Sequence, residues 1–307
     1  MQSRLIELLK TSWTLFRIIA LISSSIVIIL SSLLPLFMHT SISTSYLIYM
    51  FVFLSSAAII VHGGLTHLLN DYADYQSGTD EKSPAVLSGG SRVIQKNFLS
   101  PETVFNLGKW VTISLLIIAL ISVLFGYFEI TILILVGVWA AVSYSLPPLQ
   151  LSYRPFIGEW LSMFPAVFFI GIAGPWIILE SIPLWAYQNA LINGLICMTW
   201  VMIHHIPDLE ADRAASPKKE TSIVWFIEKF GLNFAKYPAL IYYLLALLFT
   251  VWILFSRFWT GLIVIILLLI GLFFINNIRP TDIDQVTKIE KIILLSAIVI
   301  AIVLGIF

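Results

Sequence analysis

Two short acidic segments stand out in a sequence that carries few other charges. The first segment contains Asn70, Asp71, Asp74 and Asp80, and the second runs from Asp208 to Asp212. Within each segment two aspartates lie three or four residues apart, a spacing that places both carboxylates on one face of a helix. Mg²⁺ binds a few carboxylates together with the oxygens of a substrate phosphate. The spacing therefore predicts a pair of Mg²⁺ ions that hold a diphosphate.

Polar residues near these segments are candidates for binding the anionic substrate. Residues 88–92 read Ser-Gly-Gly-Ser-Arg, so backbone N–H groups and Arg92 can bind an anion, although a flexible loop with one surface arginine is an equally good interpretation. Lys218 and Lys219 either bind the diphosphate or anchor the chain at the membrane surface. The remaining candidates are Asn70, Asp80, Tyr144, Arg154 and His205.

Two histidines, His204 and His205, come directly before the second acidic segment. Adjacent helical residues point in different directions, so we expect at most one of them to face the site. A buried, hydrogen-bonded histidine is the alternative role for either. Zinc is not expected, because no cysteine or further histidine has the spacing of a zinc site. Cys197 is the only cysteine, which excludes an intrachain disulfide.

The elements that must position these residues are membrane helices. Of the 307 residues, 59% are hydrophobic and 11% are charged, whereas about a quarter of a soluble domain is charged. Apolar runs of about 20 residues, enough to cross the hydrocarbon core, recur along the chain without the alternation of barrel strands. They predict an all-α polytopic membrane protein with nine spans, at about 17–37, 46–68, 107–126, 130–146, 158–179, 185–206, 238–256, 258–276 and 289–307.

The distribution of basic residues predicts the orientation of these spans. With the N-terminus in the cytoplasm, every Lys and Arg except Arg257 lies in an inner segment, which indicates an N-in, C-out topology. Both acidic segments then face the cytoplasm. The formal net charge is zero, so nothing indicates binding to nucleic acid. No linker divides the sequence, and we expect a single domain over residues 1–307.

Two local signals predict helix ends beside the acidic segments. Ser100-Pro101-Glu102 is a favourable helix start, because serine caps, proline tolerates the first position and glutamate favours the dipole. Pro207 disfavours helical geometry at Ile206 and should break the preceding helix there.

Three motifs carry a family resemblance. Residues 70–80 read Asn-Asp-Tyr-Ala-Asp-Tyr-Gln-Ser-Gly-Thr-Asp, residues 208–215 read Asp-Leu-Glu-Ala-Asp-Arg-Ala-Ala, and Tyr153-Arg154 precedes Gly158-Glu159. With the nine predicted helices, these motifs resemble the UbiA superfamily of intramembrane prenyltransferases, and most closely its 1,4-dihydroxy-2-naphthoate polyprenyltransferases of menaquinone synthesis. The chain departs from that pattern at residues 216–221, at Pro155, and at His204-His205, where asparagines are frequent in the quinone enzymes.

The resemblance implies a fold and a reaction. The helices would surround a central cavity with a cytoplasmic polar cap and a side opening to lipid, in a bacterial cell membrane. Two Mg²⁺ ions would bridge the diphosphate of a polyprenyl donor, and an aromatic acceptor, 1,4-dihydroxy-2-naphthoate, would attack the allylic cation. The implied metal ligands and catalytic residues are Asp71, Asp74, Asp208 and Asp212.

Three other functions remain compatible with the sequence. The first is prenyl transfer to another acceptor, because the departures at residues 216–221, Pro155 and His204-His205 leave the acceptor open. An intramembrane terpene cyclase would use the same acids, with a double bond of the donor's own chain attacking the cation. An ion-coupled transporter is the remote alternative, because the acids gather at helix ends and not at mid-span, where transporter sites usually lie.

Overall fold

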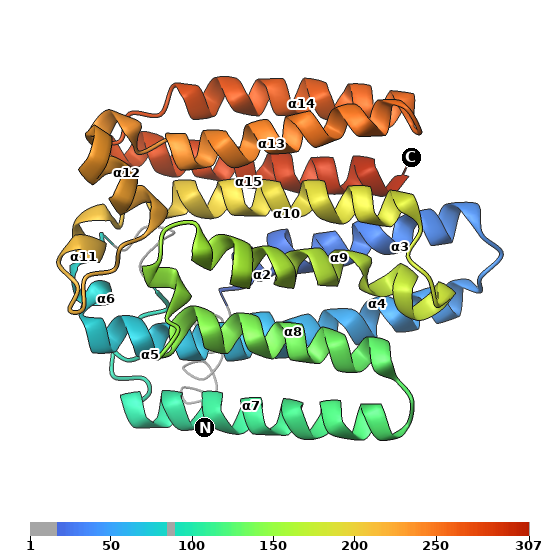
Figure 1. Cartoon of the computed structure of the whole chain (residues 1–307), viewed down its shortest axis with the longest axis horizontal. Coiled ribbons are helices and arrows are strands. Elements are labelled where there is room, and N and C mark those ends of the chain that lie inside the picture. Colours follow the sequence, from blue (N-terminus) through green and yellow to red (C-terminus); the bar gives the residue numbers. More distant parts are fainter. Residues whose placement is uncertain (1–16, 85–89, 307) are drawn as a thin grey trace, which may run out of the picture.

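The computed structural model describes residues 17–84 and 90–306, and within these ranges the protein is helical and contains no strand (Figure 1). The longer helices are α3 (Val27–His39), α4 (Thr44–Ala58), α5 (His67–Ser77), α7 (Pro101–Leu124), α8 (Phe128–Ser145), α9 (Phe164–Leu179), α10 (Leu184–His204), α13 (Tyr237–Leu254), α14 (Phe258–Asn276) and α15 (Ile283–Ile306). The shorter ones are α2 (Ile18–Leu21), α6 (Thr79–Lys82), α11 (Leu209–Arg213) and α12 (Ser222–Phe230). The predicted all-α fold class is confirmed.

Eight helical segments in the described ranges are long and apolar enough to cross a membrane. The longest is continuous from Thr44 to Ser77, because α4 and α5 are joined by a π-helical stretch, and the first acidic motif occupies its last turns. Helix α10 has 21 residues but is less apolar, since it includes Gln188, Asn189 and Asn193. It matches the sixth predicted span, and its passage across the bilayer stays a prediction.

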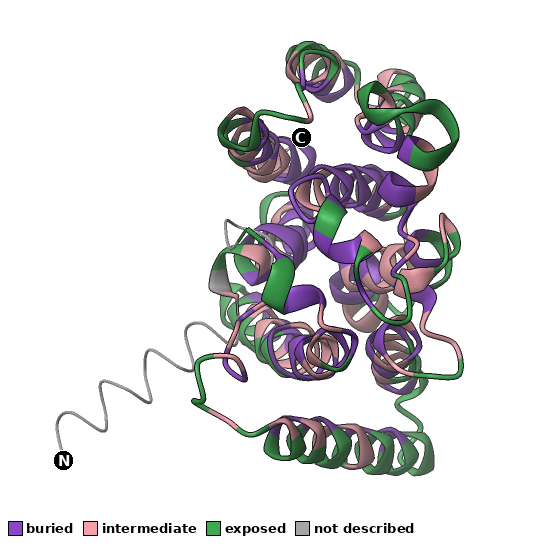
Figure 2. Cartoon of the chain, turned by 90° about the vertical axis from the view of Figure 1, so that its left-hand side faces the viewer, coloured by how far each residue is buried: buried purple, intermediate pink, exposed green. Residues whose placement is uncertain are grey.

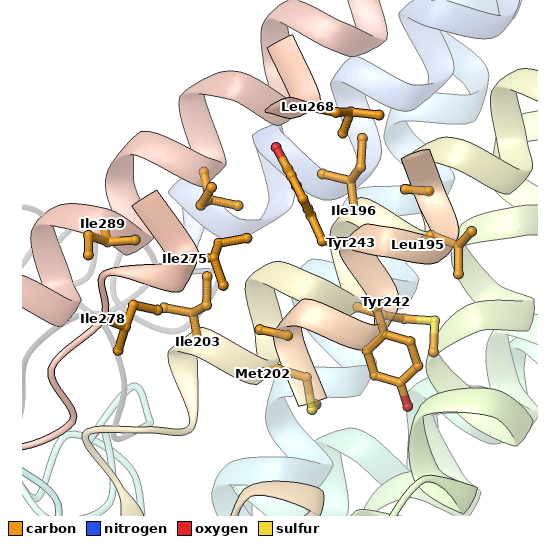
Figure 3. Close-up of a cluster of buried hydrophobic side chains, with 14 of the residues drawn as sticks. Leu195, Ile196, Met202, Ile203, Tyr242, Tyr243, Leu268, Ile275, Ile278 and Ile289 are labelled. Carbon is orange, nitrogen blue, oxygen red and sulfur yellow. The ribbon is translucent and has the colours of Figure 1, made fainter. Parts of the chain in front are cut away.

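Helix α10 lies at the centre of the bundle, packed against α9, α13 and α15. Its apolar side chains join those of α13, α14 and α15 in the largest buried cluster of the described residues, where Ile203, Ile275 and Ile278 lie close together (Figure 3). Lipid is as apolar as these side chains, so the helices associate mainly through close packing. Gly271 illustrates this, because a Cβ at this position would collide with Tyr243.

The outer surface of the bundle is apolar, as expected for a protein solvated by lipid. Figure 2 shows buried residues on the inward sides of the helices and exposed residues on the outside. Large apolar side chains on that outside include Trp110, Leu124, Phe255 and Phe273. Exposed apolar area on this scale would be a liability in water, and it is compatible with a bilayer.

The shorter helices α6, α11 and α12 gather at one end of the bundle, at the left of Figure 1. Both predicted helix ends beside them are confirmed: the Ser100 hydroxyl accepts a hydrogen bond from the Thr103 N–H at the start of α7, and α10 stops at His204, before Pro207. The long helices therefore deliver both acidic segments to the same end.

Candidate active site

A cavity of about 600 Å³ opens inside the bundle beneath this polar end. Its polar lining comprises Arg17, Ser24, Ser25, Ser56, His62, Thr66, His67, Asn70, Asp74, Thr79, Asp80, Ser122, Tyr144, Ser162, His204, His205, Asp208 and Lys219. The remaining walls are mostly apolar side chains of α4, α8 and α9, such as Leu54, Ile134 and Val167. The cavity thus joins a charged region to an apolar one, as an amphipathic lipid requires.

Helix α5 positions the two aspartates of the first segment, both of which are buried. The backbone N–H of Ser91 donates to Asp71 Oδ1 at 3.1 Å, and the Ser91 hydroxyl donates to the other oxygen. Asp74 Oδ2 accepts a hydrogen bond from Asn70 at 2.5 Å. Both carboxylates of this segment are therefore bound by the protein's own donors.

Lys219 supplies the principal positive charge at the two segments. It is 4% exposed, and its Nζ lies 2.7 Å from Asp74 Oδ1 and 4.0 Å from Asp212 Oδ1. A buried ammonium is costly unless it is paired, and this one is shared between the two acidic segments. Lys219 thus occupies the region where the carboxylates converge.

The second acidic segment begins where α10 ends. Asp208 precedes α11 and accepts a hydrogen bond from the Ser83 hydroxyl. Asp212 lies within α11 and is 1% exposed, and neither of its carboxylate oxygens has a hydrogen-bond partner in the described ranges. Its nearest polar neighbours are His205 Nδ1, 3.7 Å from Oδ2, and Lys219 Nζ, 4.0 Å from Oδ1. A buried carboxylate without hydrogen bonds is costly, so a further cation would be favoured there.

Two further hydrogen bonds join the loops that carry the acidic segments. The Ser216 N–H donates to the Ser77 carbonyl at 2.9 Å, and Lys82 Nζ donates to the Ala214 carbonyl at 3.1 Å. Segments more than 130 residues apart in the sequence thereby form one polar cap over the cavity. The cap makes the two acidic motifs parts of a single site.

Asp80 adds a further buried carboxylate to this site. It is 1% exposed, and a Cβ on the neighbouring Gly90 would collide with its carboxylate, so only glycine permits this approach. Burial, together with the charges of Asp74 and Asp71, raises the pKa of Asp80 to about 8. A pKa of about 8 keeps Asp80 mostly protonated at neutral pH, so the crowded carboxylates disfavour a further negative charge here.

Burial and neighbouring charges also shift the pKa values of two other groups in the cap, Asp212 and Lys219. Burial raises the pKa of the Asp212 carboxyl. Burial by itself would lower the pKa of Lys219, but the carboxylates of Asp74 and Asp212 outweigh it and hold that pKa well above its usual value. The ammonium is therefore a permanent cation, and the carboxylates around it still favour additional positive charge.

The donor set of the cap fits Mg²⁺ in the presence of a phosphate ligand. No three His, Cys, Asp or Glu side chains of the described ranges converge on one metal position as they stand. Mg²⁺ seldom needs a complete protein cage, however, because one or two carboxylates and phosphate oxygens can complete its coordination. The unbonded oxygens of Asp212 and the carboxylate pairs meet that requirement.

The structure places the predicted site residues in three groups. Those that line the cavity are Asn70, Asp74, Asp80, Tyr144, His205, Asp208 and Lys219. Asp71 and Asp212 are buried beside it, in contact with residues of the cap. Those that it does not bring to the cavity are Arg92, Arg154 and Lys218.

These last three residues make other contacts or face outward. The Arg92 guanidinium donates to the Ser83 carbonyl at 2.6 Å, Lys218 pairs with Glu228 at 2.6 Å, and Arg154 is exposed. Ser88 and Gly89 of the predicted anion-binding loop lie outside the described residues. In the described part of that loop, the Ser91 N–H binds a carboxylate of the protein.

One expectation about the adjacent histidines is wrong. Both His204 and His205 line the cavity, with their rings 6.1 Å apart and nearly perpendicular. His205 caps the end of α10 and still has right-handed helical backbone geometry, so the two rings do point in different directions, yet both contact the same cavity.

Several cavity residues were not among the sequence-based candidates. Arg17 and His62 line the cavity, and His62 Nδ1 lies 2.8 Å from the Ser25 hydroxyl. Ser25 and His62 lie in the π-helical stretches Ile22–Ile26 and Ile59–Thr66, a geometry that is frequent at functional sites. The only sequence signal for these residues was a polar side chain within or beside an apolar run.

Comparison with known proteins identifies the family. The sequence matches the UbiA prenyltransferase family over residues 30–297. No curated protein matches the chain. A UbiA homolog from Archaeoglobus fulgidus bound to GPP and Mg²⁺ has a TM-score of 0.65 and 15% identity over 96% of this chain and 99% of that one. The same homolog bound to DMAPP and Mg²⁺ has a TM-score of 0.64 and 14% identity over 95% and 99% of the two chains.

The two structural likenesses concern the fold, and the family match covers most of the sequence. The polytopic helical architecture, the internal cavity and the family match agree with one another. The chain therefore belongs to the UbiA prenyltransferase family and is a multi-pass membrane enzyme.

Proposed function

We propose that this enzyme transfers a polyprenyl group from a polyprenyl diphosphate to an aromatic acceptor, with Mg²⁺ at the diphosphate. The observation that carries the proposal is the meeting of two acidic segments over a largely apolar cavity of about 600 Å³. The structures of the Archaeoglobus homolog, which contain GPP or DMAPP with Mg²⁺, support the same donor class.

The polar cap is the proposed diphosphate site. The residues that would hold Mg²⁺ are Asp71, Asp74, Asp208 and Asp212. Bound there, Mg²⁺ would neutralise charge on the leaving diphosphate, which would lower the barrier to breaking the C–O bond. Lys219 and Arg17 add positive charge at the same end of the cavity. Asn70 positions Asp74 through their 2.5 Å hydrogen bond.

The apolar part of the cavity is the proposed site of the prenyl chain. Each buried methylene contributes about 0.8 kcal/mol, so side chains of α4, α8 and α9 would favour a long donor. The same walls exclude water, which would otherwise capture the allylic cation. The protein would thus contribute to catalysis by positioning the donor, by placing charged side chains at its diphosphate and by excluding water from the cavity.

The proposed acceptor is 1,4-dihydroxy-2-naphthoate, and the proposed setting is a bacterial cell membrane with the active site toward the cytoplasm. The spacing of the first motif and the residues Tyr153-Arg154 support this acceptor. The excess of Lys and Arg on one side of the predicted spans supports the orientation.

The test is a product analysis with purified enzyme in detergent. Wild type is incubated with Mg²⁺, a series of prenyl diphosphates and either dihydroxynaphthoate or hydroxybenzoate, followed by mass spectrometry of lipids and measurement of pyrophosphate. A prenylated naphthoquinol supports the proposal in full. Pyrophosphate together with a cyclic hydrocarbon from donor alone would identify a cyclase. No pyrophosphate with any donor would contradict prenyl transfer, and would reopen the transporter alternative.

A further inference from the structure

A buried glutamate far from the diphosphate motifs in sequence is not used by the proposed donor chemistry. Glu290 lies in the apolar helix α15 and is 0% exposed. Its Oε1 lies 2.7 Å from Nδ1 of His204 on α10, and its Oε2 has no hydrogen-bond partner in the described ranges. A carboxylate inside a membrane segment is costly, so its retention with one specific partner indicates a function.

His204 connects this carboxylate to the cavity. It lines the cavity wall, and its ring packs on Trp200 with ring centroids 5.3 Å apart. The titratable groups that face it are Glu290 from α15 and His205 on the adjoining turn. Because Glu290 binds Nδ1, we assign the proton of the neutral ring to Nδ1, which leaves Nε2 as the nitrogen able to accept a proton from a bound molecule.

A carboxylate that binds one nitrogen of an imidazole fixes the tautomer of the ring. When the ring also faces a substrate cavity, its other nitrogen can act as a general base. Trp200 and His204 together offer aromatic surface on which a flat ring can stack. The diphosphate cap begins at Asp208, one helical turn beyond His204, and that residue also lines the cavity. An acceptor ring beside Trp200 would therefore lie near the polar end, where the donor's reactive carbon is expected.

We propose that His204 is the general base that accepts the hydroxyl proton of the aromatic acceptor, and that Glu290 is its positioning residue. This inference rests on the proposed function, because it assumes that an acceptor with a ring hydroxyl binds in the cavity. It assigns the acceptor side of the site to α10 and α15, apart from the acidic motifs that hold the diphosphate.

The step is balanced as follows. Nε2 of His204 takes the hydroxyl proton while a ring carbon forms a bond to C1 of the donor, and the C1–O bond to diphosphate breaks. The ring is then a dienone and the imidazole a cation that the Glu290 carboxylate stabilises. Aromaticity returns when the attacked carbon loses its other substituent, either as carbon dioxide or as a proton that the released diphosphate accepts. The imidazolium then returns its proton to the ring oxygen.

The experiment measures kcat of wild type and His204→Gln on hydroxyaromatic acceptors whose hydroxyl acidity is varied by halogen substituents. A general base contributes about 10² to 10⁴-fold, so we expect His204→Gln to lose at least about a hundredfold on the least acidic acceptor. The loss should shrink as the acceptor becomes more acidic, because an ionised hydroxyl needs no base. The KM for the donor should change little.

Three matched variants separate a chemical role from a structural one. Glu290→Gln should show a smaller loss with the same dependence on acceptor acidity. His62→Gln alters another cavity histidine, whose ring bonds to Ser25, and any loss it causes should not depend on acceptor acidity. Adding imidazole to His204→Ala should restore part of the rate. This second variant keeps the test valid if His204→Gln does not fold.

The outcomes separate this inference from the proposed function. A uniform loss in His204→Gln across all acceptors, or a rate equal to wild type, would overturn the base assignment while prenyl transfer stands. Wild type that releases pyrophosphate but prenylates no aromatic acceptor would overturn both.

Discussion

The two acidic segments meet over one cavity, but the protein satisfies their carboxylates to different degrees. In the first segment, Ser91 donates two hydrogen bonds to Asp71, and an asparagine and a lysine bind Asp74. In the second, neither oxygen of Asp212 has a hydrogen-bond partner in the described ranges. The chain's own donors thus bind both carboxylates of the first segment. In the second they bind Asp208 through Ser83, whereas Asp212 has only Lys219 at 4.0 Å and His205 at 3.7 Å nearby.

The supporting elements explain this contrast. Most of the first segment occupies the end of a continuous 34-residue helical stretch, so a long regular element carries Asp71 and Asp74. The second lies on α11, a helix of five residues after a proline break. A short helix between loops can adjust when a ligand arrives, and we infer that the second segment does most of the adjusting.

The largest expected effect is loss of activity when either segment loses one cavity-lining carboxylate. Asp74→Asn and Asp208→Asn should each lower kcat/KM for the donor by about 10³-fold or more, because the charge that develops on the diphosphate loses its compensation. Glu228→Gln, at a surface ion pair, is the control and should retain activity. A difference of more than about tenfold between the two aspartate variants would argue against equal participation of the segments.

The next effect concerns the lysine shared by both segments. Lys219→Met should lower the free energy of unfolding of the Mg²⁺-free protein by about 3–5 kcal/mol, because two buried carboxylates lose their cation. Adding Mg²⁺ should raise its thermal midpoint more than that of wild type. Lys218→Met is the matched control, since the neighbouring lysine forms a surface pair worth about 0–1 kcal/mol. Equal destabilisation by the two substitutions would contradict the role of Lys219.

A smaller effect should separate the aspartates that lie beside the cavity. Asp71→Asn weakens hydrogen bonds from Ser91 and should cost about 1–3 kcal/mol of unfolding free energy without Mg²⁺. Asp212→Asn loses no hydrogen bond and only the more distant of the two ion pairs of Lys219, at 4.0 Å, so it should cost less. Chemical denaturation in detergent with EDTA measures both, and a greater cost for Asp212→Asn would break the comparison.

The smallest expected effects come from the serines that bind the carboxylates. Ser83→Ala and Ser91→Ala should each cost about 1 kcal/mol of unfolding free energy, the usual net value of one hydrogen bond. Activity should fall less than tenfold, because neither serine carries charge. The thermal midpoint and kcat of each variant check this, and a loss as large as that of an aspartate variant would place the serine in direct contact with the substrate.

The fold could be predicted from the sequence because the bilayer imposes length and hydrophobicity on each helix. The helix start at Ser100 and the helix end before Pro207 were predicted from cap and proline chemistry, which acts locally. The second helix continues for nine residues beyond its predicted end at 68, since hydropathy falls in the acidic motif while the helix continues. Hydropathy marks where polarity changes and not where a helix ends.

The site could be predicted only in part. The paired aspartates were found because each pair is regular in sequence, and Lys219 was among the basic candidates beside them. Glu290 was missed because its partner, His204, is 86 residues away. The sequence also could not distinguish Lys218 from Lys219, although one is on the surface and the other is buried between two carboxylates. Such distinctions depend on long-range packing.

The central claim is that both acidic segments hold one diphosphate through Mg²⁺. The most direct test is calorimetric titration of a non-reactive prenyl thiolodiphosphate into wild type, Asp74→Asn and Asp208→Asn, with Mg²⁺ and with EDTA. We expect tight binding only for wild type with Mg²⁺, and a loss of at least about a hundredfold in affinity for each variant. Binding in EDTA, or by either variant, that is as tight as that of wild type with Mg²⁺ would contradict the shared Mg²⁺–diphosphate site.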